Sequence, residues 1–74
     1  MDSLKNRLYN YVNSRNYWIN GGELERLALE NNHKASTASR KLRELAEKGL
    51  IDRKIDGSAR SVWYKKRTDN PFML

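Results

Sequence analysis

The chain has no cysteine, and only one histidine and one proline occur among its 74 residues. Disulfide bonds and a zinc site of cysteine and histidine ligands are therefore excluded as supports for its fold. No stretch approaches the roughly 18 apolar residues that a membrane-spanning helix requires, and the amino terminus has no apolar run of the signal-peptide type. We therefore expect a soluble, cytoplasmic protein without membrane contact, with one core of leucines and aromatic residues.

The residue sets that catalysis requires are also missing. The single histidine, His33, has no cysteine near it, and the pair Gly21-Gly22 is too short for a phosphate-binding loop. Carboxylates alternate with cations at helical spacing, as Glu44 does with Arg40 and Lys48, which is typical of surface ion pairs. The sequence therefore predicts no enzyme activity, cofactor, metal site or small-molecule substrate.

Positive charge is concentrated in the second half of the chain, whose formal net charge as a whole is +6. Residues 1–33 carry four Lys or Arg and four Asp or Glu, whereas residues 34–67 carry eleven Lys or Arg against four Asp or Glu. A short chain with its cations on one segment has the electrostatic footprint of a protein that binds a phosphate backbone. A solvated surface rich in lysine and arginine is the alternative explanation.

Apolar residues at helical spacing predict two helices in the first half. The first helix runs to about Arg15, and the second begins near Gly21. Asn20 and Glu23 have the spacing of a capping box at the start of the second helix. Gly21 and Gly22 weaken its first turn, which suggests close approach to a neighbouring element. The core positions expected on these helices are Leu4, Leu8, Tyr11, Val12, Leu24, Leu27 and Ala28.

A third helix follows a turn at residues 31–34, which lack apolar periodicity and are rich in turn formers. It covers about residues 35–48, and Gly49 is well placed just past its end, where a left-handed conformation is favoured. Its inward face is formed by residues spaced three or four apart, namely Ala35, Ala38, Leu42 and Leu45.

The sequence then changes to a period of two, which predicts strands over residues 50–55 and 61–65. Asp56-Gly57 is a hairpin-turn signal between them, and residues 17–19 form a short β-prone run before the second helix. The expected fold class is therefore α+β, with three helices, a short first strand and a carboxyl-terminal β-hairpin. We expect one domain over residues 1–66 and a flexible tail over residues 67–74.

The two tryptophans are expected to support the fold. We expect Trp18 to cover the helical core. In the last strand, alternation places Val62 and Tyr64 on one face and Trp63 on the other, and either face is suited to pack under the helices.

Three stretches of the chain, residues 18–24, 36–45 and 47–53, resemble the winged helix-turn-helix superfamily, and small prokaryotic or phage transcription regulators in particular. They are similar to the strand-to-helix entry, the recognition helix and the exit into the wing of these domains. The resemblance covers about residues 4–66. It implies a winged helix that binds double-stranded DNA, with the helix at about 35–48 in the major groove and a basic wing at about 53–60 on the backbone. A transcriptional regulator or a phage-type accessory factor in a prokaryotic, archaeal or virus-infected cytoplasm would fit this implication.

Site residues follow from the face of the third helix opposite its apolar stripe and from the cations of the wing. Arginine is able to bond bidentately to guanine, and short hydroxyl side chains allow close approach to the groove. The expected base contacts are Ser36, Thr37, Ser39, Arg40 and Arg43. The expected backbone contacts are Lys34, Lys41, Arg53, Lys54, Ser58 and Arg60, which would raise affinity without specifying sequence.

Two other functions stay open at this point. Winged helices also serve as protein-docking modules in larger assemblies, where the basic face would meet an acidic partner. Binding of structured RNA is the other alternative. No additional dimerisation helix follows the wing, so we expect a monomer or a weak dimer on DNA.

Overall fold

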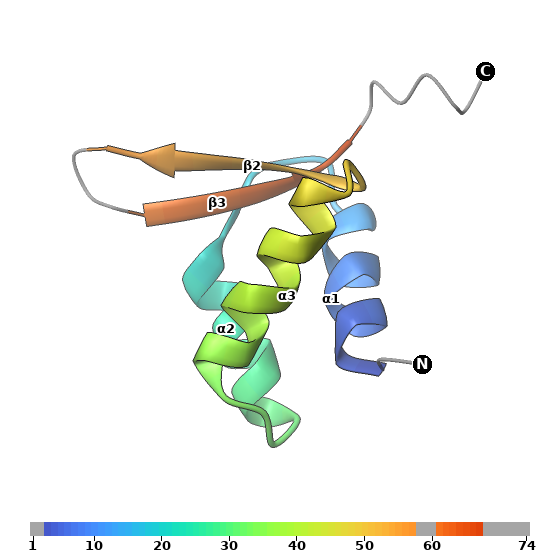
Figure 1. The fold of residues 1–74 in the computed structure, drawn as a ribbon, viewed down its shortest axis with the longest axis vertical. Helices are drawn as coiled ribbons and strands as arrows, with labels where there is room; N and C mark the ends of the chain where they lie inside the picture. Colours follow the sequence, from blue (N-terminus) through green and yellow to red (C-terminus); the bar gives the residue numbers. More distant parts are fainter. Residues whose placement is uncertain (1–2, 58–60, 68–74) are drawn as a thin grey trace.

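Three helices lie against one face of a three-stranded antiparallel sheet in a computed structural model that describes residues 3–57 and 61–67 (Figure 1). The elements in chain order are α1 (Ser3–Asn13), β1 (Ile19–Asn20), α2 (Gly21–Glu30), α3 (Ala35–Glu47), β2 (Ile51–Asp56) and β3 (Ser61–Lys66). The strand order is β1-β3-β2. This confirms the prediction of an α+β chain with three helices, a short first strand and a carboxyl-terminal hairpin.

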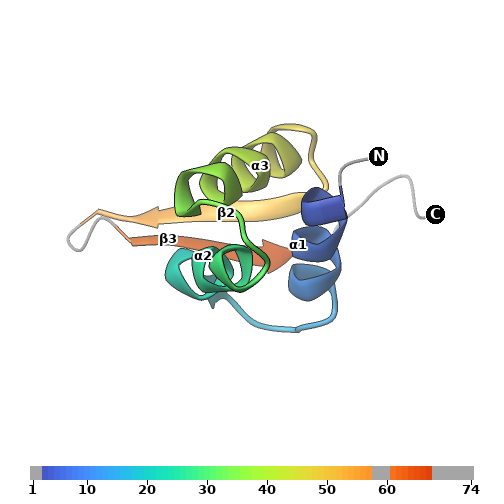
Figure 2. The ribbon, with the colours of Figure 1, turned by 90° about the horizontal axis from the view of Figure 1, so that it is seen from below.

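Each helix covers a different part of the sheet. Seen from below, α3 lies over β2 and α2 lies over β3, while α1 packs at the end of the sheet where β2 begins (Figure 2). The paired strands β2 and β3 extend beyond α2 and α3 on the other side (Figure 1). One side of the hairpin therefore continues the surface formed by the two helices.

Helix α1 ends at Asn13, two residues before the expected end, because the backbone hydrogen bonds change at its last turn. The N–H of Arg15 donates to the carbonyl of Val12, three residues back, so the last turn leaves α-helical geometry. The Arg15 guanidinium donates to the Tyr11 carbonyl at 3.0 Å and lies 3.5 Å from the centroid of the Tyr11 ring. The first strand is also shifted, since the residues that pair with β3 are Ile19 and Asn20.

The capping box expected at the start of α2 does not form. The Asn20 side chain caps the helix by accepting from the N–H of Gly22 at 2.7 Å, but Glu23 accepts instead from the Tyr11 hydroxyl on α1. The expected close approach is present at Gly21, where an added Cβ would lie 3.0 Å from the carbonyl oxygen of Val62 on β3. The lack of a side chain therefore lets α2 begin directly against the sheet.

Gly49 ends α3 as expected, with a φ of +76°. The N–H of Leu50 bonds to the Leu45 carbonyl and the N–H of Gly49 bonds to the Ala46 carbonyl, both at 3.0 Å. This pair of bonds is the Schellman motif, which satisfies carbonyls at the helix end and turns the chain into β2. Arg67, expected in the tail, donates to the Gly49 carbonyl at 3.1 Å. The rest of that tail, residues 68–74, lies outside the described residues.

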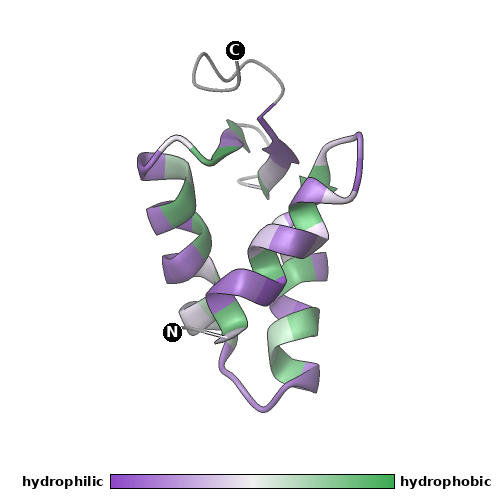
Figure 3. Ribbon diagram, turned by 90° about the vertical axis from the view of Figure 1, so that its right-hand side faces the viewer, coloured by the Kyte–Doolittle hydropathy of each residue, from purple (hydrophilic) through white to green (hydrophobic). Residues whose placement is uncertain are grey.

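The core forms where the apolar sides of the three helices meet beneath the sheet (Figure 3). Its fully buried members with the largest side chains are Leu8, Val12, Ile19, Leu24, Leu42 and Ile51. Tyr64 is 3% exposed, so the face of β3 that carries Val62 and Tyr64 is the one under the helices.

The expectation for Trp18 was wrong. Its ring lies on the opposite face of the sheet, where the Lys54 ammonium is 4.3 Å from its centroid and where Trp63 lines the same hollow. The reason is strand alternation, because Ile19 pairs with Tyr64 on the helix side and its neighbour Trp18 is then directed to the other side.

Candidate functional site

The outer side of α3 carries exposed polar and basic residues. Ala38, Leu42 and Leu45 are buried, and this leaves Ser36, Arg40 and Arg43 exposed on the side away from the core. Lys34 precedes the helix as its N-cap residue and is exposed, and it makes no side-chain capping bond. Thr37 and Lys41 are partly exposed. The helix therefore presents hydroxyl groups at its amino end and guanidinium groups one and two turns further on.

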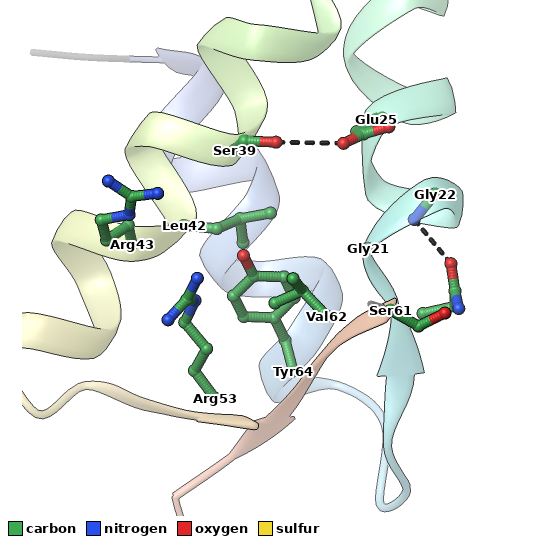
Figure 4. Close-up of a pocket in the computed structure, with 11 residues that line it drawn as sticks. Gly21, Gly22, Glu25, Ser39, Leu42, Arg43, Arg53, Ser61, Val62 and Tyr64 are labelled. Atoms are coloured by element: carbon green, nitrogen blue, oxygen red, sulfur yellow. Dashed lines mark hydrogen bonds between the residues drawn. The ribbon is translucent and has the colours of Figure 1, made fainter. Parts of the chain in front are cut away.

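Ser39 differs from the other expected base contacts. Its hydroxyl donates to the Glu25 carboxylate of α2 at 3.0 Å, and its side chain is partly buried (Figure 4). Ser39 was expected to contact a base, and the structure places it on the flank of α3 that packs beside α2. In this structure the hydroxyl of Ser39 is engaged within the protein.

A cavity of about 380 Å³ lies between the start of α2, the middle of α3 and the helix side of the hairpin. Arg43 from α3 and Arg53 from β2 line it together, and in Figure 4 their side chains lie on the same side, with Gly22 and Ser61 across from them. A second hollow of about 320 Å³ is also lined by both arginines and by Arg67. The tertiary structure therefore brings together two guanidinium groups that are ten residues apart in sequence.

The Arg53 Nε atom is buried and has no hydrogen-bond partner, and it is the only such side-chain atom among the residues that the structure describes. A buried donor without an acceptor costs free energy, on the order of 1–3 kcal/mol. An acceptor that bonded to this atom would remove the cost, and for one entering from the cavity this requires the Arg53 side chain to turn. Glu25 is the one carboxylate among the described residues that line the cavity, and it accepts from Ser39.

The acidic residues of α3 are not paired as expected. Glu44 forms an ion pair with Lys5 of α1 at 3.2 Å, the only ion pair found within residues 3–57 and 61–67. The hydrogen bond from Lys5 lowers the pKa of the Glu44 carboxyl. The expected pairing of Glu44 with Arg40 and Lys48 was therefore wrong, and Arg40 makes no ion pair with a described carboxylate.

The cations expected on the wing divide between the two faces of the sheet. Arg53 pairs with Tyr64 in the β2–β3 register and lies on the helix side, whereas Lys54 pairs with Trp63 and lies on the opposite side. Ser58 and Arg60, the other two expected backbone contacts of the wing, lie outside the described residues. Arg53 therefore lies on the same surface as the outer side of α3, whereas Lys54 lies on the opposite face of the sheet.

The period of two over residues 50–55 places Arg53 on the same side of its strand as Ile51 and Ile55, and this alternation is the sequence signal for the cavity. The missing information was which side of the strand faces the helices. Packing of Ile51, which is 1% exposed, beneath α3 decides that question and brings Arg53 to Arg43.

Within the described part of the chain, no group of three or more His, Cys, Asp or Glu residues is placed to hold a metal ion. None of its helices has both the length and the apolar character needed to cross a membrane. No known family model, curated protein or solved structure matches this chain. Its function is therefore inferred from its own residues and their geometry.

Proposed function

We propose that this chain is a winged helix domain that binds duplex DNA, with α3 in the major groove and the helix side of the β2–β3 hairpin on the phosphate backbone. The observation that carries the proposal is the convergence of Arg43 and Arg53 on one cavity at the junction of α3 and the hairpin. A DNA phosphate supplies the acceptor oxygens that two guanidinium groups without described ion-pair partners require.

The remaining expected contacts are consistent with this orientation. Ser36 and Arg40 are exposed on α3, the helix that also carries Arg43. A guanidinium at this place is able to bond to guanine O6 and N7, and Lys34 lies at the amino end of α3, where the helix dipole favours a phosphate. Arg40 is therefore assigned as the main base-reading residue, and Lys34, Lys41 and Arg53 as backbone contacts. Arg43, which the sequence suggested as a base contact, is also assigned to the backbone because it shares the cavity with Arg53.

A module of this kind suits a transcriptional regulator or a phage-type accessory factor. No catalytic step is part of the proposal. An acidic protein partner would use the same arginines, and the experiment below distinguishes it from DNA.

The test is fluorescence anisotropy with a labelled random-sequence duplex at several salt concentrations. Four phosphate contacts from Lys34, Lys41, Arg43 and Arg53 would give a slope of log affinity against log salt of about −3.6. Arg43→Gln and Arg53→Gln should each reduce the steepness by about 0.9. Arg7→Gln, which removes an exposed arginine from α1, is the matched control and should leave the slope unchanged.

Equal slopes for all four proteins would show that the cavity does not hold a phosphate. Absence of duplex binding at low salt would reject the DNA proposal and make an acidic protein the leading partner. Selection from a random duplex library then tests base reading, because Arg40→Ala should broaden the selected sequences without unfolding the protein.

A further inference from the structure

Both tryptophans of the chain lie on the face of the sheet that the helices leave uncovered. Trp18 and Trp63 are partly exposed and line a hollow of about 360 Å³ together with Lys54 and Asp56. We call this surface, with Lys65 beside it, the tryptophan face. Large aromatic side chains usually contribute to a core or to a binding surface, and the core of this domain forms without either tryptophan.

Two ammonium groups meet at one ring on this face. The Nζ atoms of Lys54 and Lys65 lie 4.3 Å and 5.9 Å from the centroid of Trp18. Asp52 is directly opposite Lys65 in the strand register, yet neither lysine forms an ion pair with a described carboxylate. Both ammonium groups therefore lie beside the Trp18 ring, where a phosphate that reached them would gain from their positive charge.

We propose that the tryptophan face binds a segment of single-stranded nucleic acid, with a base stacked on Trp63 and the neighbouring phosphates held by Lys54 and Lys65. Aromatic platforms next to cations are the recurring means of binding unpaired strands, because every base has a face that stacks and every nucleotide has a phosphate. The bases of a duplex are stacked on each other and do not offer such faces. This surface is separate from the α3 cavity, and the proposal does not depend on duplex binding there.

An acidic peptide satisfies fewer of these groups. Its carboxylates would pair with the two lysines, but acidic side chains leave the indole of Trp63 without a stacking partner. A nucleotide places its negatively charged phosphate near the lysines and its uncharged base over the Trp63 ring. Because only Lys54 and Lys65 are available, we expect one or two phosphates to be bound.

The experiment is a titration of intrinsic fluorescence with a short oligothymidylate, which does not pair with itself. Because both tryptophans lie on this face, their emission reports directly on it. Stacking should quench the emission, and Trp63→Leu should weaken binding by roughly 5- to 150-fold. Lys54→Gln and Lys65→Gln should each reduce the salt slope by about 0.7.

Two further variants separate the surfaces and guard against misfolding. Arg43→Gln should leave the oligothymidylate affinity unchanged, because it alters only the α3 cavity. Trp63→Phe keeps a smaller stacking ring and should restore part of the affinity that Trp63→Leu loses, while amide NMR spectra confirm that both variants are folded.

The proposal is overturned if oligothymidylate leaves the fluorescence of the folded protein unchanged at low salt. It is also overturned if polyglutamate displaces oligothymidylate at equal charge concentration, or if Arg43→Gln abolishes the binding. Quenching by oligothymidylate without any affinity for duplexes would support this inference and refute only the function proposed for α3.

Discussion

The unpartnered Nε of Arg53 predicts that one substitution makes the free protein more stable and its DNA binding weaker. Arg53→Met retains an unbranched side chain of similar reach but removes the buried donor and the charge. Relieving an unsatisfied buried donor is worth on the order of 1–3 kcal/mol. Because the side chain is only partly buried, we expect a gain in the free energy of unfolding at the low end, about 1 kcal/mol.

In a domain of this size a gain of about 1 kcal/mol raises the melting temperature by roughly 4–8 °C. Duplex affinity should change in the opposite direction. A hydrogen bond to a charged group contributes about 1.5–3 kcal/mol, which corresponds to a loss of roughly 10- to 150-fold in affinity. A gain in stability with a loss of binding is expected where a functional residue has an unsatisfied polar atom in the free protein.

Urea unfolding monitored by circular dichroism, together with anisotropy on a labelled duplex, measures both effects. Arg40→Met is the matched control, because the Arg40 side chain is exposed on α3 and should give no gain in stability. A decrease of about 1 kcal/mol or more in the stability of Arg53→Met would refute the reasoning, since it would show that Nε has an acceptor in the free protein. Higher stability with unchanged duplex affinity would instead refute the phosphate contact.

Three other substitutions test the fold. Gly49→Ala forces a side chain into a φ of +76° and should lower the free energy of unfolding by about 1 kcal/mol; no change in urea midpoint would contradict the Schellman end. Leu8→Ala empties a fully buried site and should cost about 2–5 kcal/mol, seen as a large loss in melting temperature. Glu44→Gln should lose stability relative to wild type at neutral pH. Because Lys5 lowers the pKa of the folded Glu44 carboxyl, this difference is present above the unfolded pKa and should vanish as pH falls through the folded pKa. A difference that persists in acid would contradict the Lys5–Glu44 pair.

Local signals predicted the elements well. The apolar stripes of the helices, the cap at Asn20 and the left-handed Gly49 depend on residues within a few positions of each other, and the structure contains all of them. Two element boundaries were displaced by one or two residues, in one case by a side chain that bonds to the preceding turn and in the other by pairing with a distant strand. Arg15 folding back on Tyr11 and the pairing of β1 with β3 are the two cases.

Long-range partners could not be read from the sequence. Ser39 bonds to Glu25 across 14 positions and Glu44 pairs with Lys5 across 39, so nothing in their neighbourhoods announced these contacts. Spacing on α3 alone grouped Ser39 with the expected base contacts and favoured a Glu44 paired within the helix. Packing of α1 and α2 against the two flanks of α3 supplies other partners, Lys5 for Glu44 and Glu25 for Ser39.

By itself the sequence determined the elements, their order and the alternation that separates Arg53 from Lys54 and Tyr64 from Trp63. Only the tertiary structure decided which of the two alternating sets lies under the helices. The physical reason is that alternation is a local property of an extended backbone, whereas the choice of face depends on where the apolar sides of three helices meet. That choice sends Arg53 to the cavity beside Arg43 and leaves Trp18 and Trp63 on the open face of the sheet.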